Sequence, residues 1–167
     1  MTRPATLLLC ASALVISAAT ARAADTFGLQ DSDRVAVYHA QGAQIYECRK
    51  EPDGALRWAF KEPVAALFEE RTPVGVHARG PSWSFSDGSE LKAKVVAQAP
   101  AASAEDIPHL MLSVTSAQGT SIALARTILR VNTKGGRAPA ACHDAGKLLS
   151  VPYAADYVFY IAEPPAQ

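Results

Sequence analysis

The sequence predicts an all-β protein, a single antiparallel β-sandwich or barrel of about nine short strands with little helix and one disulfide. Through most of the chain, apolar and polar residues alternate with a period of two, which is typical of strands with one buried face and one wet face. Turn sequences containing Gly, Asp or Pro separate the alternating runs. Hydrophobic residues make up 49% of the chain and charged residues 19%, which is a globular composition.

The first 23 residues have the features of a secretory signal peptide. Arg3 supplies a positive start, an apolar run extends from Leu7 to Ala19, and Ala21-Arg22-Ala23 has the small-x-small form of a cleavage site. The apolar run is short for crossing a bilayer, so an N-terminal membrane anchor is the less favoured interpretation. Cleavage before Ala24 would leave 144 of the 167 residues. We therefore expect an exported protein, periplasmic or extracellular.

Cleavage also changes the charge and the cysteine count. The full chain balances 16 basic against 16 acidic residues, but the removed segment contains Arg3 and Arg22 and no acid, so the mature chain has a net charge of −2. This argues against nucleic acid or an anionic membrane as the main partner. We expect no transmembrane segment in the mature chain. In an oxidising compartment the remaining cysteines predict a Cys48–Cys142 disulfide, with two free thiols as the alternative.

The alternation places the elements in chain order. We expect a lead-in at 24–33, one β domain at 34–162 and a flexible tail at 163–167. The expected strands are 34–39, 43–49, 56–61, 74–79, 82–86, 91–98, 109–116, 121–132 and 156–162. The turns between them are Gln41-Gly42, Pro52-Asp53-Gly54, Asp87-Gly88, Gln118-Gly119 and Gly135-Gly136.

Four segments need a separate interpretation. Residues 63–70 are predicted to form one or two helical turns that begin at Pro63. Residues 98–108 and 133–152 are predicted to be loops. Tyr157 to Ile161 is apolar on both faces, which indicates a central strand. A change of phase near Arg126 indicates a bulge in the strand at 121–132.

The densest group of polar and aromatic residues lies between 74 and 89. On an extended strand His77 and Arg79 share a face, and the Gly80-Pro81 corner then turns Trp83 toward the core or a cleft. A guanidinium beside an imidazole favours the neutral form, which can accept a proton or bind a metal. One interpretation is a ligand pocket with His77 as polar contact and Trp83 as stacking wall. The other has His77 bonded to a turn and Trp83 in the core.

Two later segments add further candidates. The segment 130–139 contains Asn132 and Gly135-Gly136, whose amides form either an anion nest or a turn that needs positive φ. Tyr153, Asp156 and Tyr157 bring two phenols and a carboxylate to the start of the last strand, where they either tie a corner or line a pocket. The candidate ligand-binding set is therefore His77, Trp83, Asp87, Asn132, Tyr153, Asp156 and Tyr157.

Motifs for catalysis and for cofactors are missing from the sequence. The four histidines of the mature chain share no spacing that places two of them on one strand face or helical turn, so we expect no metal site. No Gly-x-Ser-x-Gly or Gly-x-Gly-x-x-Gly motif occurs, so we expect no cofactor and assign no catalytic residue. Acids such as Asp87 and Asp144 are more typical of turn hydrogen bonding than of paired carboxylates.

Several motifs occur in order along most of the mature chain. They include Gln41-Gly42-Ala43-Gln44-Ile45-Tyr46-Glu47-Cys48, Trp58-Ala59-Phe60, Gly75-Val76-His77, Gly80-Pro81-Ser82-Trp83, Asp87-Gly88-Ser89, Arg130-Val131-Asn132-Thr133 and Val151-Pro152-Tyr153. This set resembles a family of exported bacterial and fungal proteins, the domain of unknown function number three-four-five-five. The resemblance covers about 34–161 and implies one secreted β-rich domain without an established activity. Arg79, His109 and His143 depart from the family pattern, so a site that rests on them would not be the family's site.

Two hypotheses for the function follow. The first is a non-catalytic exported domain that binds a small molecule, a glycan or a cell-envelope partner, because Trp and Tyr lie at turns beside a β-scaffold. The alternative is a secreted, hydrolase-like enzyme that uses His77 with a nearby carboxylate. Convergence of His77, Trp83 and Asp87 on one pocket would favour the enzyme, and dispersal would oppose it.

Overall fold

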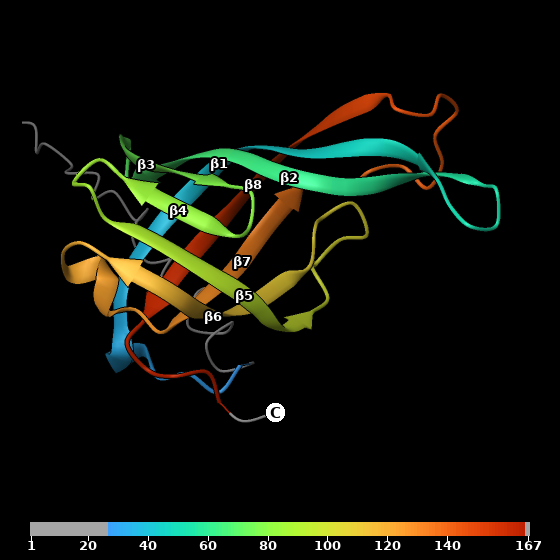
Figure 1. Ribbon diagram of the computed structural model, residues 1–167. Coiled ribbons are helices and arrows are strands. Elements are labelled where there is room, and N and C mark those ends of the chain that lie inside the picture. Colours follow the sequence, from blue (N-terminus) through green and yellow to red (C-terminus); the bar gives the residue numbers. More distant parts are fainter. Residues whose placement is uncertain (1–26, 166–167) are drawn as a thin grey trace, which may run out of the picture.

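The segments in which apolar and polar residues alternate form the strands of a closed antiparallel barrel (Figure 1). Each strand pairs with its neighbours in sequence, and β8 pairs with β1 to close the barrel. The computed structural model describes residues 27–165. Its strands are β1 (Arg34–Lys50), β2 (Leu56–Glu69), β3 (Thr72–Ala78), β4 (Ser82–Phe85), β5 (Glu90–Ala99), β6 (His109–Gln118), β7 (Thr127–Gly135) and β8 (Leu148–Tyr160). Two 3-10 helices, η1 (Asp31–Asp33) and η2 (Ser121–Leu124), complete the elements of the described part. The predicted all-β class is confirmed, with eight strands instead of about nine.

Both faces of the last strand are buried. Tyr157 and Phe159 point into the barrel and join its inner core, whereas Val158 and Tyr160 pack in a second apolar cluster on the outer wall. Leu29, from the segment before β1, belongs to that outer cluster. The segment before β1 thus covers the outer face of β8, which explains why this strand has apolar residues on both faces. The expected central strand is confirmed. The expected signal peptide and cleavage site at 1–23 lie outside the described residues.

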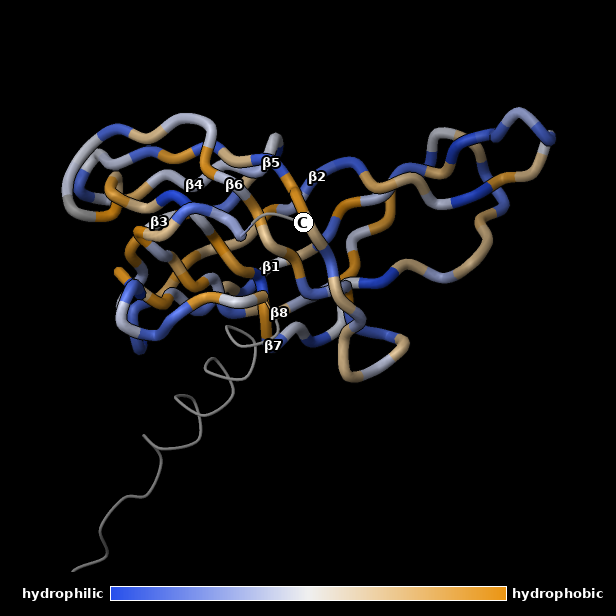
Figure 2. The backbone as a smooth tube through the Cα atoms, turned by 90° about the horizontal axis from the view of Figure 1, so that it is seen from below, coloured by the Kyte–Doolittle hydropathy of each residue, from blue (hydrophilic) through white to orange (hydrophobic). Residues whose placement is uncertain are grey.

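Strands β1 and β2 are 17 and 14 residues long and, together with the start of β8, extend beyond the other strands of the barrel (Figure 1). The extension is mostly hydrophilic toward its tip, while hydrophobic and hydrophilic positions alternate within the barrel (Figure 2). The predicted Cys48–Cys142 disulfide is present, with 5.8 Å between the two Cα atoms. Beside it, Tyr46 donates a hydrogen bond to the carbonyl of Gly136 over 2.7 Å. These links fasten the β7–β8 connection to the extension.

The turn predicted at Gln41-Gly42 is wrong, because β1 runs through it without a break. Gly42 pairs with Ala65 of β2 and with Tyr153 of β8. A Cβ atom at Gly42 would collide with the carbonyl oxygen of Val64. This glycine therefore permits a close approach of two strands, which is the other common role of glycine inside a strand.

The helical turns predicted at 63–70 are also wrong. Pro63, Ala65 and Leu67 are buried and alternate with more exposed residues, so the segment continues β2. Pro63 at the start of the segment suggested a helix, but the pairing of the segment with β1, and from Ala65 onward also with β3, overrides that preference. Pro63 is tolerated because β3 pairs with β2 only from Ala65 onward, so β2 has a single neighbour at the proline.

Three other boundaries differ from the prediction. The strand expected at 121–132 begins as η2, and β7 starts only at Thr127. The phase change near Arg126 therefore marks the start of a strand, and the bulge lies between Val131 and Lys134 instead. The loop expected at 133–152 is shorter, because β7 extends to Gly135 and β8 begins at Leu148. The loop expected at 98–108 is observed between β5 and β6.

Candidate functional site

A pocket lies where the short β3–β4 hairpin ends. β3 pairs with β2 only at Ala65–Glu69, and β4 pairs with β5 only at Glu90–Lys92. Beyond the Gly80-Pro81 corner, β2 and β5 therefore have no strand between them, and β7 is visible behind the hairpin in Figure 1. The pocket at this opening has a volume of about 120 Å³, and every strand from β2 to β8 contributes to its lining. We call it the mouth pocket.

Three buried rings form the floor of the mouth pocket. The imidazole of His77 stacks on the indole of Trp83, with 4.7 Å between ring centroids and 20° between planes. The phenol ring of Tyr157 lies 4.8 Å from His77 and 5.4 Å from Trp83. None of the three residues is more than 4% exposed. The sequence placed these three residues in the candidate set, and the structure brings them together with Tyr153, which is buried in the same core.

His77 is held as a neutral imidazole. Its Nδ1–H donates to the carbonyl of Ser82 over 2.9 Å, which leaves Nε2 as an acceptor. The pKa of His77 is lowered to about 4, mainly by burial, and the positive charge of Arg130 contributes to the same shift. The expectation that Arg79 would be the neighbouring guanidinium is wrong, because β3 ends at Ala78 and Arg79 is exposed. Arg79 forms an ion pair with Glu62 over 3.2 Å.

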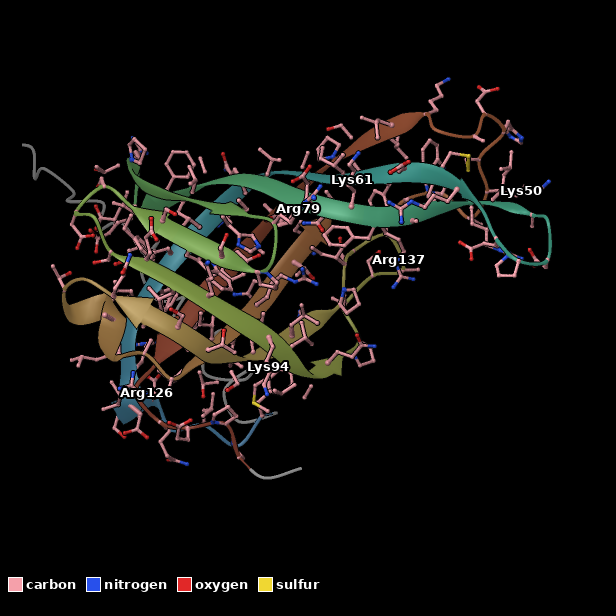
Figure 3. All side chains as sticks on the ribbon, viewed as in Figure 1. Lys50, Lys61, Arg79, Lys94, Arg126 and Arg137 are labelled. Carbon is pink, nitrogen blue, oxygen red and sulfur yellow. A yellow bond between two sulfur atoms is a disulfide. The ribbon has the colours of Figure 1, made fainter. Side chains whose placement is uncertain are left out.

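The polar lining of the mouth pocket includes two cations that the sequence analysis did not select. Arg130 of β7 donates from Nε and Nη2 to the carbonyl of Pro108 over 3.2 and 2.9 Å. Among residues 27–165, no carboxylate lies within 4.0 Å of its guanidinium. The Nζ atom of Lys61 on β2 lies 3.6 Å from a carboxylate oxygen of Glu47, and Figure 3 labels Lys61 on β2 and Arg79 at the end of the β3–β4 hairpin. One signal was available for Arg130, since it is a lone charge in the apolar run Ile128–Val131.

Buried polar atoms without a hydrogen bond collect at this end of the barrel. The indole N–H of Trp83 is one of them, and the hydroxyls of Tyr153 and Tyr157 and the amide nitrogen of Gln44 lie close to one another without a well-formed hydrogen bond. Burial raises the pKa of Tyr157 well above its usual value, so its O–H remains available to donate. A buried donor without a partner costs about 1–3 kcal/mol. Because several such atoms lie beside one pocket, we take this pocket as the candidate site.

Asp87 does not lie in the mouth pocket. It occupies the β4–β5 turn, at the opposite end of β4 from Pro81. One carboxylate oxygen accepts from Thr120 Oγ1 over 2.6 Å and the other from the amide of Ser89 over 2.9 Å. These hydrogen bonds, with the Thr120 bond the largest cause, lower the pKa of Asp87. His77 and Trp83 therefore converge, and Asp87 is separate from them.

Asn132 and Asp156 lie on the outer wall of the barrel. Asp156 faces His39 across the β1–β8 pair, and His39 Nδ1–H donates to its carboxylate over 2.9 Å. The side-chain amide of Asn132 donates to the other carboxylate oxygen over 2.8 Å. Asn132 has a φ of 51°, in the left-handed region. A groove of about 440 Å³ lies beside His39 and Asp156. His39 was missed because 117 residues separate it from Asp156.

The anion nest considered at Gly135-Gly136 contains a carboxylate of the chain itself. Both glycines have positive φ, at 66° and 87°. The amide of Gly135 donates to the carboxylate of Asp106 over 2.6 Å, and Lys134 lies 3.7 Å from the same group. Asp106 is 4% exposed. The turn is therefore closed by an internal salt link.

Within 27–165, no three His, Cys, Asp or Glu side chains are grouped as metal ligands would be. In the same part of the chain, none of the helices is long and apolar enough to cross a bilayer. The expectations about metals and cofactors stay predictions.

The fold and the mouth pocket define the class of this protein as an up-and-down β-barrel with a mostly apolar pocket at an opening in its wall. The chain belongs to the family described as "Protein of unknown function (DUF3455)", whose model matches residues 30–73 and 69–161. This confirms the resemblance seen in the motifs. No curated protein and no solved structure matches the chain significantly.

Proposed function

We propose that this chain is an exported, non-catalytic binding protein that holds a small molecule in the mouth pocket. The observation that carries the proposal is the floor of the pocket, where the indole N–H of Trp83 is buried without a partner beside the imidazole of His77 and the phenol of Tyr157. Convergent polar groups in an otherwise apolar pocket are the usual composition of a ligand site. Export rests on the signal features at 1–23 and agrees with the Cys48–Cys142 disulfide.

Size and burial favour a small molecule over a glycan or an envelope partner. A volume of about 120 Å³ is close to that of cavities that hold a single benzene ring, at about 150 Å³. Trp83 has no exposed surface, so it does not offer the open stacking platform on which a sugar or a protein partner would dock. A compact ligand that enters through the opening between β2 and β5 suits this geometry.

The geometry does not favour the alternative of a hydrolase that uses His77 with a carboxylate. Among the described residues, the hydrogen-bond partner of His77 is the carbonyl of Ser82, and Asp87 is engaged with Thr120 and Ser89. A pKa of about 4 also makes His77 a weak base at neutral pH. These facts support a binding role for the imidazole.

The test is a thermal-shift screen of the mature protein against fragments with the size of one ring. Val95 lines the pocket and is 48% exposed, so Val95→Trp would fill the opening without disturbing the core. Val64, 57% exposed on β2 and outside the pocket lining, provides the control Val64→Trp. We expect fragments that raise the melting temperature of the wild type and of Val64→Trp but not of Val95→Trp. A shift that survives in Val95→Trp, or no fragment that stabilises the wild type, would contradict the proposal.

A further inference from the structure

We infer that the ligand of the mouth pocket is a small organic acid, a carboxylate on an aromatic or branched apolar body, whose acid group binds to Arg130. This inference rests on the proposed function and names its ligand class.

Arg130 is a half-buried cation without a counter-ion among the residues that the structure describes. Its neighbours in β7, Leu129 and Val131, have no exposed surface. Two nitrogens of the guanidinium bind the carbonyl of Pro108, which fixes its plane. The third nitrogen, Nη1, has no hydrogen bond to a carbonyl or carboxylate oxygen in the described range 27–165, and the hydroxyl of Tyr157 lies close to the guanidinium. A desolvated charge without a partner is costly, and a bound anion would remove that cost.

The other polar groups that line the pocket are mainly donors. Lys61 contributes a second positive charge, Trp83 an indole N–H and Tyr157 a hydroxyl. Within the described part of the chain, no Asp or Glu belongs to the lining. The available acceptor is Nε2 of His77, since its Nδ1 is bonded to Ser82. A carboxylate accepts through two oxygens and donates nothing, so it matches this set of groups.

The apolar side chains in the pocket walls determine the chemistry of the rest of the ligand. Phe60, Val95, Leu110 and Leu112 face the pocket and would contact an apolar body. A phosphate or an inorganic anion would leave these side chains without a partner. An amine would place a like charge beside Arg130, and a neutral alcohol would leave the guanidinium uncompensated. Only an anion with an apolar body satisfies both the charge and the walls.

The experiment compares four probes on the mature protein by isothermal titration calorimetry: benzoate, benzyl alcohol, benzylamine and acetate. We expect benzoate to bind about ten- to a hundred-fold more tightly than benzyl alcohol, as for a charge-assisted hydrogen bond. Benzylamine and acetate should bind more weakly still. In Arg130→Gln the preference for benzoate over benzyl alcohol should disappear. The matched control is Arg79→Gln, an exposed arginine at the same opening, which should keep that preference.

The outcomes separate this inference from the proposed function. If benzoate and benzyl alcohol bind equally and Val95→Trp abolishes both, the pocket binds ligands and the anion inference is wrong. If benzoate binds Val95→Trp as well as wild type, it binds elsewhere and the inference is again wrong. If no probe binds, both fail for ligands of this size.

A second measurement keeps Arg130 unchanged, so it tests the inference even if Arg130→Gln does not fold. Trp58→Phe leaves Trp83 as the only indole of the chain, so one indole N–H signal remains in the nitrogen–proton correlation spectrum. Benzoate should shift this signal strongly and acetate should not. An indole signal that benzoate leaves in place would overturn the inference.

Discussion

The imidazole of His77 lies flat on the indole of Trp83, with 4.7 Å between ring centroids. The ring of Tyr157 also lies against this imidazole, at 4.8 Å between ring centroids. Together the two rings remove the imidazole from water. A charged imidazole would have to form in that apolar position with Arg130 nearby, which is why burial lowers the pKa of His77 to about 4. Protonation of His77 is therefore coupled to unfolding.

We predict that the free energy of unfolding falls as the pH is lowered from about 6.5 to about 4. In this window the unfolded chain binds a proton at His77 and the folded chain does not, so stability is fully present above pH 6.5 and is lost toward pH 4. The loss from this residue is roughly 3 kcal/mol. Urea unfolding across the window should show a smaller pH dependence in His77→Gln than in the wild type.

His109 provides the control for this measurement. Its pKa is also lowered, mainly by burial, but His109 is only partly buried. His109→Gln should therefore change the pH dependence less than His77→Gln does. A wild-type pH dependence in His77→Gln would show that the imidazole is not neutral in the folded state.

A second prediction concerns Asp156 on the outer wall. Asp156→Ala should lower the free energy of unfolding by about 1–3 kcal/mol, because it leaves the amide of Asn132 and the imidazole of His39 without their partner. It should leave ligand affinity at the mouth pocket unchanged, because Asp156 is not part of that lining. Urea denaturation and the benzoate titration measure the two effects.

Asp53→Ala is the matched control, since Asp53 forms an exposed ion pair with Arg57. Exposed ion pairs contribute little, so this variant should be close to wild type in stability. If Asp156→Ala reduced affinity in the pocket while keeping wild-type stability, Asp156 would belong to the ligand site after all, as the sequence analysis allowed.

The strands were predictable because their signal is local. The alternation in 82–86 and 91–98 predicted β4 and β5 with boundaries close to those observed. Barrel closure depends instead on the pairing of β1 with β8, whose residues His39 and Asp156 are 117 positions apart. No local pattern encodes that register, so the sequence left sandwich and barrel open and did not connect His39 with Asp156.

The site was predictable in part for the same reason. His77 and Trp83 lie close together in sequence, and a single hairpin stacks them. Arg130 reaches the pocket only because the barrel brings β7 opposite that hairpin. Asp87 is near His77 in sequence, but the hairpin directs it to the other end of β4. Proximity along the chain therefore predicted which residues share the mouth pocket within one hairpin, but it did not predict this beyond the hairpin.

A third prediction tests the role of Gly42 in strand approach. Gly42→Ala should lower the free energy of unfolding by about 3 kcal/mol, because the added Cβ would collide with the backbone of Val64 and Ala65 in β2. Gly54→Ala is the comparison, since nothing lies within 4 Å of that position and only its φ of 84° is strained. That strain costs about 1–2 kcal/mol. Equal losses in the two variants, measured by urea denaturation, would mean that β2 shifts to accept the methyl group.

The last prediction concerns the disulfide that fastens the projecting end of β1. Cys48 and Cys142 are 94 residues apart, and closing so long a loop stabilises the folded state by roughly 4–5 kcal/mol in the chain-entropy model. The double variant Cys48→Ser, Cys142→Ser should therefore unfold at a clearly lower urea concentration than the wild type. Reductant should lower the wild-type midpoint toward that of the variant and leave the variant itself unchanged. A variant with the wild-type midpoint would mean that the hydrogen bonds around Cys48, such as that from its amide to the carbonyl of Lys147, hold the connection without the covalent link.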